Sequence, residues 1–206
     1  MVTIIPTILT KSVWEAKKKL REIEKYCKEV HIDIADNEFV SNKTFPASTI
    51  PLLKTKSKKI VHAMCFCPEK HVKQWKNCKI IFHAEAVADV KKTAKKLALT
   101  GIKPAIAITP NSPASIAIPA LPYVSEVLVM TVYPGFGGQP LIKETLKKIK
   151  EIKTLKNIKV SVDGGINKTT AKLAVKAGAD ILYIGSALWK EAFGLRLKEI
   201  RSLLRK

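Results

Sequence analysis

The sequence predicts one domain of the α/β class, a (β/α)8 TIM barrel that takes up residues 1–206. Short apolar, β-branched runs alternate with lysine-rich runs of helical period along the chain, a pattern that indicates strands and helices in turn. Regular alternation favours a parallel sheet, and eight such units favour its closure into a barrel. No Ser/Gly-rich linker or break in composition divides the chain, so we expect a single domain.

The order of these runs gives the expected elements. Strands are expected, in chain order, at residues 2–8, 28–34, 58–63, 79–84, 103–108, 126–131, 158–162 and 180–184. Helices are expected near residues 12–26, 47–55, 69–75, 86–99, 113–119, 140–154, 168–177 and 195–204. Asn167 is the best-placed N-cap for the helix near 168–177.

The competing architecture is an open, doubly wound sheet. Its dinucleotide fingerprint GxGxxG should follow the first strand, where the sequence instead reads TIIPTILTKS. Polar residues also favour the barrel, because they fall at or near the C-terminal ends of the expected strands, where barrel active sites are built. These residues are Thr7, His31, Asp33, His62, His83, Glu85, Thr131, Asp163 and Ser186.

The net charge of +20 raises nucleic acid as a candidate partner. Arginine is the preferred residue for bidentate phosphate and base contacts, yet only four of the 37 basic residues are arginine. The lysines are spread over helical segments such as EAKKKLREIEKYCKE, which is typical of a solvated face. We therefore expect no nucleic-acid partner, although a positive field could speed the capture of an anionic substrate.

Composition also indicates where the protein works. No apolar run reaches transmembrane length, and the N-terminal segment lacks the basic leader and cleavage site of a signal peptide. The four cysteines follow no disulfide or zinc-ribbon spacing. We expect a cytoplasmic protein with reduced thiols and no membrane partner.

Four residues at strand ends carry the strongest functional signal. His31 and Asp33 lie two apart in EVHIDIAD and so face one side of their strand. His62 and Asp163 end two other strands, in KIVHAM and IKVSVDGG. Two imidazoles and two carboxylates suit one divalent metal ion, which could be zinc, manganese, iron(II) or cobalt, and paired carboxylates can also carry protons. The alternative, four independent hydrogen-bonded core residues, needs four coincidences.

Three glycine-rich turns indicate a phosphate cradle. PGFGGQ (134–139) precedes an expected helix, DGG (163–165) ends the seventh strand, and GSA (185–187) ends the eighth. Backbone amides in such loops bind phosphate, and barrels often place this site after strands seven and eight. Plain turn formation is the alternative, since glycine readily adopts positive φ, but three such turns in consecutive units favour the cradle.

Two further pairs lie near the strand ends. His83 and Glu85, in IIFHAEA, are expected to support the metal ligands by hydrogen bonds. Met64 and Met130 are expected as core filler. The alternative for these methionines is that they shield a reaction intermediate from water.

Seven motifs resemble one known family. They are, in order, PTIL, HIDIAD, VHAM, FHAEA, VLVMTVYPGFGGQ, VDGGI and GADILYIGSALW. From Pro6 to Trp189 the chain resembles the ribulose-phosphate 3-epimerase family, most specifically in PGFGGQ and the His–Asp motif of the second strand. The family fold is a (β/α)8 barrel, as the strand count independently predicts. The resemblance implies a metal-dependent epimerase of the pentose phosphate pathway, commonly a homo-oligomer, that inverts C3 of D-ribulose 5-phosphate to give D-xylulose 5-phosphate.

The resemblance also implies residue roles. Asp33 is expected to accept the C3 proton, and Asp163 to return one to the opposite face of an enediolate. The expected metal ligands are His31, Asp33, His62 and Asp163. The expected substrate contacts are Thr7, His62, Gly135, Phe136, Gly137, Gly138, Asp163, Gly164, Gly165, Gly185 and Ser186.

Four positions depart from the family pattern. Thr7 replaces a serine, Ala35 a methionine, Asn37 a glycine and Ala63 a leucine. The smaller Ala35 is expected to open space in the pocket, so 3-epimerisation of a related ketose phosphate, such as D-allulose 6-phosphate, is one alternative. A non-catalytic barrel that only binds sugar phosphate is another.

Overall fold

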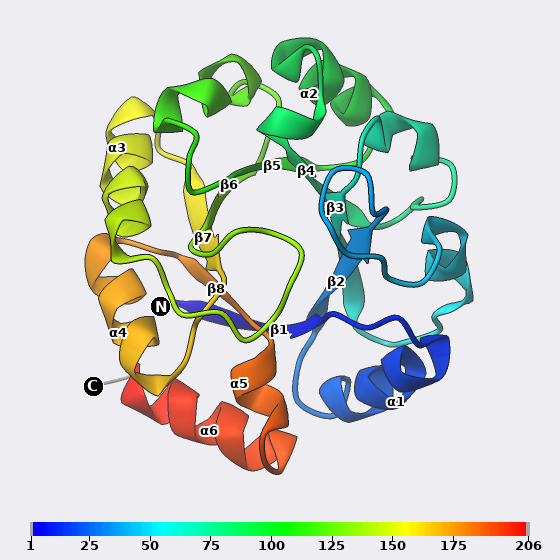
Figure 1. Ribbon diagram of the computed structural model, residues 1–206, viewed down its shortest axis with the longest axis vertical. Helices are drawn as coiled ribbons and strands as arrows, with labels where there is room; N and C mark the ends of the chain where they lie inside the picture. Colours follow the sequence, from blue (N-terminus) through cyan, green and yellow to red (C-terminus); the bar gives the residue numbers. More distant parts are fainter. Residues whose placement is uncertain (1, 205–206) are drawn as a thin grey trace.

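Eight parallel strands form a closed barrel in the computed structural model, which describes residues 2–204 (Figure 1). The strands follow one another around the barrel in chain order, and β8 pairs with β1 to close it. Their bounds are β1 (Thr3–Ile8), β2 (Glu29–Ala35), β3 (Lys58–Met64), β4 (Lys79–His83), β5 (Pro104–Ile108), β6 (Glu126–Met130), β7 (Lys159–Asp163) and β8 (Ile181–Ile184). The predicted barrel is confirmed, and every strand end lies within one residue of its expected position.

The helices surround the barrel as an outer ring (Figure 1). The α-helices are α1 (Val13–Ile23), α2 (Val90–Leu99), α3 (Lys147–Leu155), α4 (Lys168–Ala177), α5 (Ser186–Trp189) and α6 (Phe193–Leu203). Shorter 3-10 segments are η1 (Ala47–Leu52), η2 (Pro68–His71), η3 (Ala84–Ala86), η4 (Ala114–Ala120) and η5 (Lys143–Leu146). No helix among residues 2–204 is long and apolar enough to cross a membrane.

Three of the expected helices are 3-10 segments rather than α-helices. The segments expected near 47–55, 69–75 and 113–119 are η1, η2 and η4. Pro51 lies inside η1 and Pro119 inside η4. Proline removes a backbone donor and clashes with the preceding turn, so an α-helix does not continue through these positions.

The start of α4 follows the local signals in the sequence. The Asn167 side chain accepts hydrogen bonds from the backbone N–H groups of Thr169 and Thr170, and the Thr170 hydroxyl accepts one from the Asn167 N–H. This capping box begins the helix directly after the loop that ends β7. Gly178 ends the helix at φ +107°, a conformation that favours glycine.

Side chains alternate between two cores along each strand. On β2, Ile32 packs outward among the helices, while His31 and Asp33 face the barrel interior. Apolar side chains fill most of the interior, so it is a packed core and not a pore. They are Ile5, Ile60, Ile81, Ala105, Ala107, Leu128, Met130, Val132, Ile181 and Tyr183.

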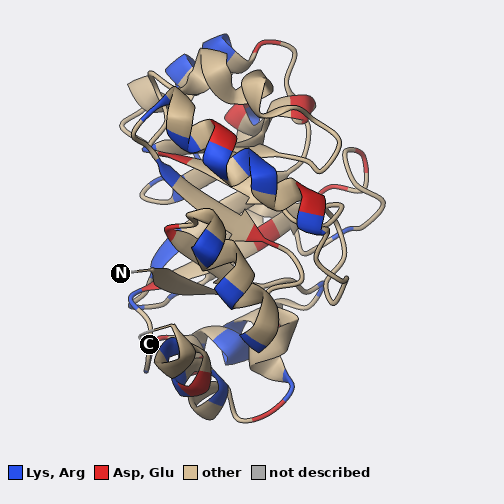
Figure 2. Cartoon of the chain, turned by 90° about the vertical axis from the view of Figure 1, so that its left-hand side faces the viewer, with Lys and Arg blue, Asp and Glu red and all other residues tan. Residues whose placement is uncertain are grey.

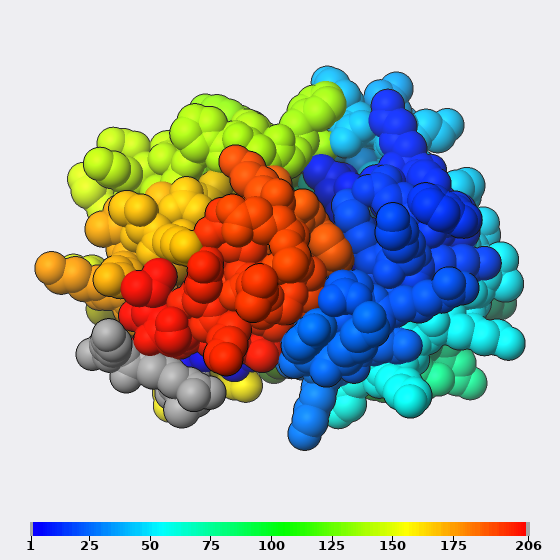
Figure 3. Space-filling model, turned by 90° about the horizontal axis from the view of Figure 1, so that it is seen from below, coloured from blue at the N-terminus to red at the C-terminus, as the bar shows by residue number. Residues whose placement is uncertain are grey.

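Charged side chains lie on the outer surface, where the first and last parts of the chain also contact each other. Lysine and arginine are spread over the outer helices (Figure 2). Helices α5 and α6 lie on the surface beside the first βα unit (Figure 3). There the rings of Tyr26 and Phe193 lie 5.9 Å apart, and Arg201 donates to the Tyr26 carbonyl at 3.4 Å. These contacts complete the helical ring around the closed sheet.

Candidate active site

The structure brings His31, Asp33, His62 and Asp163 together inside the barrel, and we call these four residues the metal cluster. One ligand atom from each lies within 4.8 Å of the others. Asp33 pairs with His62 in the register of β2 and β3, and the His62 Nδ1 lies 2.8 Å from the Asp33 Oδ1. The His31 Nδ1 lies 3.8 Å from this Asp33 oxygen and 3.9 Å from the Asp163 Oδ2. Strand parity places His31 and Asp33 on one face of β2, as predicted, and the closed barrel brings His62 of β3 and Asp163 of β7 to them.

The donor atoms of the metal cluster fit a divalent metal ion. Both ring nitrogens of His31 are buried without a hydrogen-bond partner. Burial and the nearby His62 lower the pKa of His31 well below its usual value, so its imidazole is in the neutral form that binds metals. Burial and the Asp33 carboxylate raise the pKa of Asp163 well above its usual value. A bound cation would relieve both the unpartnered imidazole and the crowded carboxylates.

His83 and Glu85 lie behind the metal cluster. The His83 Nε2 lies 2.9 Å from the His62 Nε2, and its Nδ1 lies 3.5 Å from the Glu85 carboxylate. Burial lowers the pKa of His83 to about 4. Burial raises the pKa of Glu85, but the nearby His83 and Ser112 side chains and the hydrogen bond from the Thr109 N–H outweigh it and bring that pKa to about 2. The pair thus lies where a partner that orients His62 is needed.

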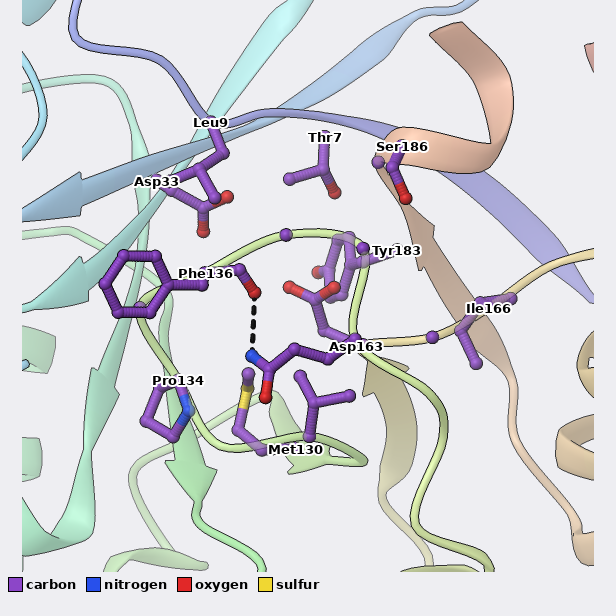
Figure 4. A pocket seen from close by; sticks show the side chains of 18 of the residues that line it. Thr7, Leu9, Asp33, Met130, Pro134, Phe136, Asp163, Ile166, Tyr183 and Ser186 are labelled. Atoms are coloured by element: carbon purple, nitrogen blue, oxygen red, sulfur yellow. Dashed lines mark hydrogen bonds between the residues drawn. The ribbon is translucent and has the colours of Figure 1, made fainter. Parts of the chain in front are cut away.

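A cavity of about 430 Å³ opens above the metal cluster at the C-terminal end of the barrel (Figure 4). Asp33, His62 and Asp163 line it, whereas His31 lies below them and does not. All the residues that the sequence suggested for substrate contact line this cavity, namely Thr7, His62, Gly135, Phe136, Gly137, Gly138, Asp163, Gly164, Gly165, Gly185 and Ser186.

The glycine turns form one wall of the cavity. A Cβ on Gly164 would lie 2.4 Å from a Val132 methyl group, and a Cβ on Gly165 would lie 2.5 Å from the Leu141 nitrogen. Both glycines also have positive φ, so close approach and conformation each require glycine here. The Thr131 hydroxyl donates to the carbonyls of Asp163 and Gly164. The loops after β6 and β7 are therefore held together beside Ser186, with an open concave surface.

Other side chains that line the cavity have less definite roles. Met64 and Met130 line it while remaining almost buried, a place that is compatible with both core filling and shielding. The Thr7 hydroxyl is buried without a partner and lies beside the cavity (Figure 4). Tyr183 and Trp189 also line the cavity. Sequence reasoning missed Tyr183, although its place two residues before Gly185 at a strand end could have marked it.

Ala35 does not widen the cavity, which corrects the expectation from its small size. Ala35 packs with Val40 and Met64, and Leu9 and Phe39 pack against this group. Ala35 is 4% exposed and does not line the cavity. Side chains from the following loop therefore occupy the space that the smaller residue leaves.

Known proteins with similar sequences point to one family. A sequence profile of the ribulose-phosphate 3 epimerase family matches residues 3–189. The chain is 31% identical to a ribulose-phosphate 3-epimerase of Bacillus subtilis (strain 168), over 93% of this chain and 94% of that one. It is 33% identical to one of Methanocaldococcus jannaschii, over 98% and 90%. It is 35% identical to one of Chlamydia pneumoniae, over 85% and 82%.

Solved structures support the fold alone. A mutant tryptophan synthase alpha-subunit from Pyrococcus furiosus superposes with a TM-score of 0.73 at 16% identity, covering 99% of this chain and 98% of that one. The tryptophan synthase complex of the same organism gives a TM-score of 0.70 at 14% identity, covering 99% and 98%. At such low identity the likeness extends to the barrel and not to the chemistry.

Proposed function

Because this chain belongs to the ribulose-phosphate 3-epimerase family and is an enzyme of the isomerase class, we propose that it interconverts D-ribulose 5-phosphate and D-xylulose 5-phosphate. The reaction inverts C3, as a step of the pentose phosphate pathway. The observation that carries this proposal is the pair of carboxylates, Asp33 from β2 and Asp163 from β7, which meet at the floor of one cavity. Inversion needs two proton carriers, because a single base returns the proton to the face from which it came.

The two aspartates divide this work between them. Asp33 accepts the C3 proton, and Asp163 returns a proton from the other face, with the roles exchanged in the reverse direction. The Asp33 carboxylate lies against His62 at 2.8 Å, which fixes its orientation toward the cavity.

One divalent cation completes the proposed chemistry. His31, Asp33, His62 and Asp163 would hold it, and zinc, manganese, iron(II) and cobalt all suit this donor set. When bound, it supplies polarisation of the substrate carbonyl, which makes the neighbouring C–H acidic enough for a carboxylate base. His83 orients His62 from behind at 2.9 Å, so His62 keeps one nitrogen directed to the cluster.

The glycine turns anchor the far end of the substrate. Backbone amides of the loops that contain Gly137, Gly165 and Gly185, together with the Ser186 hydroxyl, would bind the phosphate. All four residues line the cavity that the two aspartates share. Anchoring the phosphate away from C3 places the reacting carbon between the carboxylates and lowers the entropic barrier.

The alternatives lose support at the same site. A longer sugar, such as D-allulose 6-phosphate, was suggested by the small side chain of Ala35, which is packed under the following loop. A barrel that only binds sugar phosphate has no use for two carboxylates crowded in a buried cluster at the expense of stability. The pentose phosphate reaction is therefore the function that we favour.

A coupled epimerase assay on metal-stripped and metal-reconstituted protein tests the proposal. We expect turnover of D-ribulose 5-phosphate to be lost on chelation and restored by one equivalent of metal ion, with solvent deuterium incorporated at C3. Phosphate binding without deuterium uptake in reconstituted protein would favour the silent barrel. A large preference for D-allulose 6-phosphate would overturn the choice of substrate.

Location and assembly belong to the same proposal. We propose a cytoplasmic enzyme, which is supported by the four cysteines being free thiols. We also propose a homo-oligomer, since large apolar side chains such as Trp14 and Leu195 are each more than 60% exposed, at 72% and 66%. Analytical ultracentrifugation tests the assembly, and a monomer at micromolar concentration would contradict it.

A further inference from the structure

A second polar cluster is buried in the barrel, nearer its N-terminal end. It consists of Lys79 at the start of β4, Glu126 at the start of β6, Ser161 on β7 and Tyr183 on β8, and we call it the Glu126 network. The hydroxyls of Ser161 and Tyr183 donate to the Glu126 Oε1 at 2.5 and 2.8 Å. The Lys79 ammonium donates to the Glu126 Oε2. None of these four residues belongs to the metal cluster.

The hydrogen bonds of Glu126 hold the surrounding donor side chains in fixed positions. Its side chain is completely buried, and both carboxylate oxygens accept hydrogen bonds from side chains of three other strands. A buried carboxylate is costly unless it is paired in this way, so each donor is held in one position. The Tyr183 hydroxyl is thus fixed at the lower end of its ring.

The ring of Tyr183 lies against a metal ligand. It stacks on the His31 imidazole with 4.2 Å between ring centroids and 27° between planes. Tyr183 also neighbours Asp163 in the register of β7 and β8, and both are seen in the floor of the cavity (Figure 4). The stack is therefore a direct contact between the Glu126 network and the metal cluster.

The orientation of His31 is fixed by ring packing and not by a hydrogen bond, since its ring lies on Tyr183 at 4.2 Å and on His62 at 5.0 Å between centroids. A histidine that binds a metal usually donates its second ring N–H to a carboxylate or carbonyl, which sets the ring in place. The second ring nitrogen of His62 has a hydrogen-bond partner in His83, at 2.9 Å. Neither nitrogen of His31 has a hydrogen-bond partner. Packing must do for His31 what a hydrogen bond does for His62.

Granted the metal site proposed above, we propose that Tyr183, held by Glu126, is the positioning residue that sets the orientation of His31 for metal binding. Tyr183 acts through the stacked ring. Loss of the Tyr183 ring should change chiefly the affinity and the coordination geometry of the metal site.

Cobalt binding to the full-length protein tests this inference without turnover. Co²⁺ is titrated into metal-free wild type, Y183L, which removes the stacked ring, and Y183F, which removes only the hydroxyl bound to Glu126. We expect Y183L to bind Co²⁺ on the order of tenfold more weakly, with a changed visible absorption spectrum. We expect Y183F to fall between Y183L and wild type, and it carries the test if Y183L does not fold.

Phe82→Leu is the matched control. Phe82 is a fully buried aromatic residue of β4 that packs among the helices, so F82L removes a ring from the other core. A general loss of packing would weaken Co²⁺ binding equally in F82L and Y183L and would overturn the inference. So would wild-type affinity and spectrum in Y183L, and a Y183F protein identical to wild type would overturn the part assigned to Glu126. Wild-type protein that binds no Co²⁺ would overturn the metal site and this inference together.

Discussion

The metal cluster and the Glu126 network are both buried polar groups within one barrel, but they differ in how their atoms are satisfied. Both oxygens of Glu126 accept hydrogen bonds from side chains. In the metal cluster both nitrogens of His31 have no partner, and Asp163 is crowded by a second carboxylate. Buried polar groups cost free energy unless they are paired. The metal cluster is therefore suited to bind a cation from solution, whereas the carboxylate of the Glu126 network is already paired within the protein.

Position in the barrel explains this division. The metal cluster lies under the cavity at the C-terminal end of the strands, where a ligand can enter. The Glu126 network lies below, among packed apolar side chains. Natural proteins often accept instability where activity requires it and recover stability elsewhere. Removing a carboxylate from each of the two clusters should therefore have opposite effects on the free energy of unfolding of the metal-free protein.

The largest expected effect is on activity. D33N and D163N should each lower kcat at least about 10³-fold, because each removes one of two proton carriers and an amide cannot replace it. Circular dichroism should show a folded barrel in both variants. A coupled assay with D-ribulose 5-phosphate measures the loss.

Asp89→Asn is the matched control for this pair. Asp89 is the N-cap of α2, where its side chain accepts from the Lys92 N–H, and asparagine caps as well as aspartate does. D89N should keep full turnover. Near-normal turnover in D33N or D163N would rule out proton transfer by two aspartates.

The next largest effect is on stability and concerns the Glu126 network. E126A should lower the free energy of unfolding by about 3 kcal/mol, because it leaves the Lys79 ammonium and two hydroxyls without their buried acceptor. Urea unfolding measures this loss. Glu151 on α3 is exposed, so E151A should change the stability by less than about 0.5 kcal/mol. Equal stability of E126A and E151A would contradict the view that the Glu126 network stabilises the fold.

In the metal cluster, removing a carboxylate should raise the free energy of unfolding of the metal-free protein. The folded state raises the pKa of Asp163 above its usual 3.8, so folded protein holds this proton more tightly than unfolded chain does. Stability of metal-free wild type should therefore fall as pH rises from about 4 toward the raised pKa. An amide cannot ionise, so metal-free D163N should be more stable than wild type at pH 7.

Thermal unfolding in chelator across this pH range measures the difference. The two proteins should unfold alike near pH 3 and separate as the pH rises, with D163N the more stable. Saturating metal ion should reverse the order, since it binds the folded wild type and stabilises it. A metal-free D163N that is less stable than wild type at pH 7 would show that the two clusters do not differ as we describe.

The sequence predicted the metal cluster but not the network beneath it, and the reason is physical. His31 and Asp33 share a face by strand parity, and Asp163 ends a strand, so local pattern is enough to bring them together in a barrel. Glu126 begins its strand, away from the C-terminal end where a barrel gathers its functional residues, and no local pattern pairs it with Tyr183. The same holds for Ala35, whose apparent gap is filled by Phe39 and Val40 from a loop without a periodic pattern.

The smallest expected effect concerns the outer helices, where charge is solvated rather than buried. Lys95, Lys150 and Lys172 lie on α2, α3 and α4 and are exposed. The triple change to glutamine should leave kcat within about twofold of wild type, because exposed charges that do not line the cavity are screened by salt. At low ionic strength the kcat/KM of the triple variant should be modestly lower than that of wild type, since a positive field speeds capture of an anionic substrate. Adding salt should remove this difference, and a loss of kcat that persists in salt would mean that these lysines act on the chemistry and not through the field.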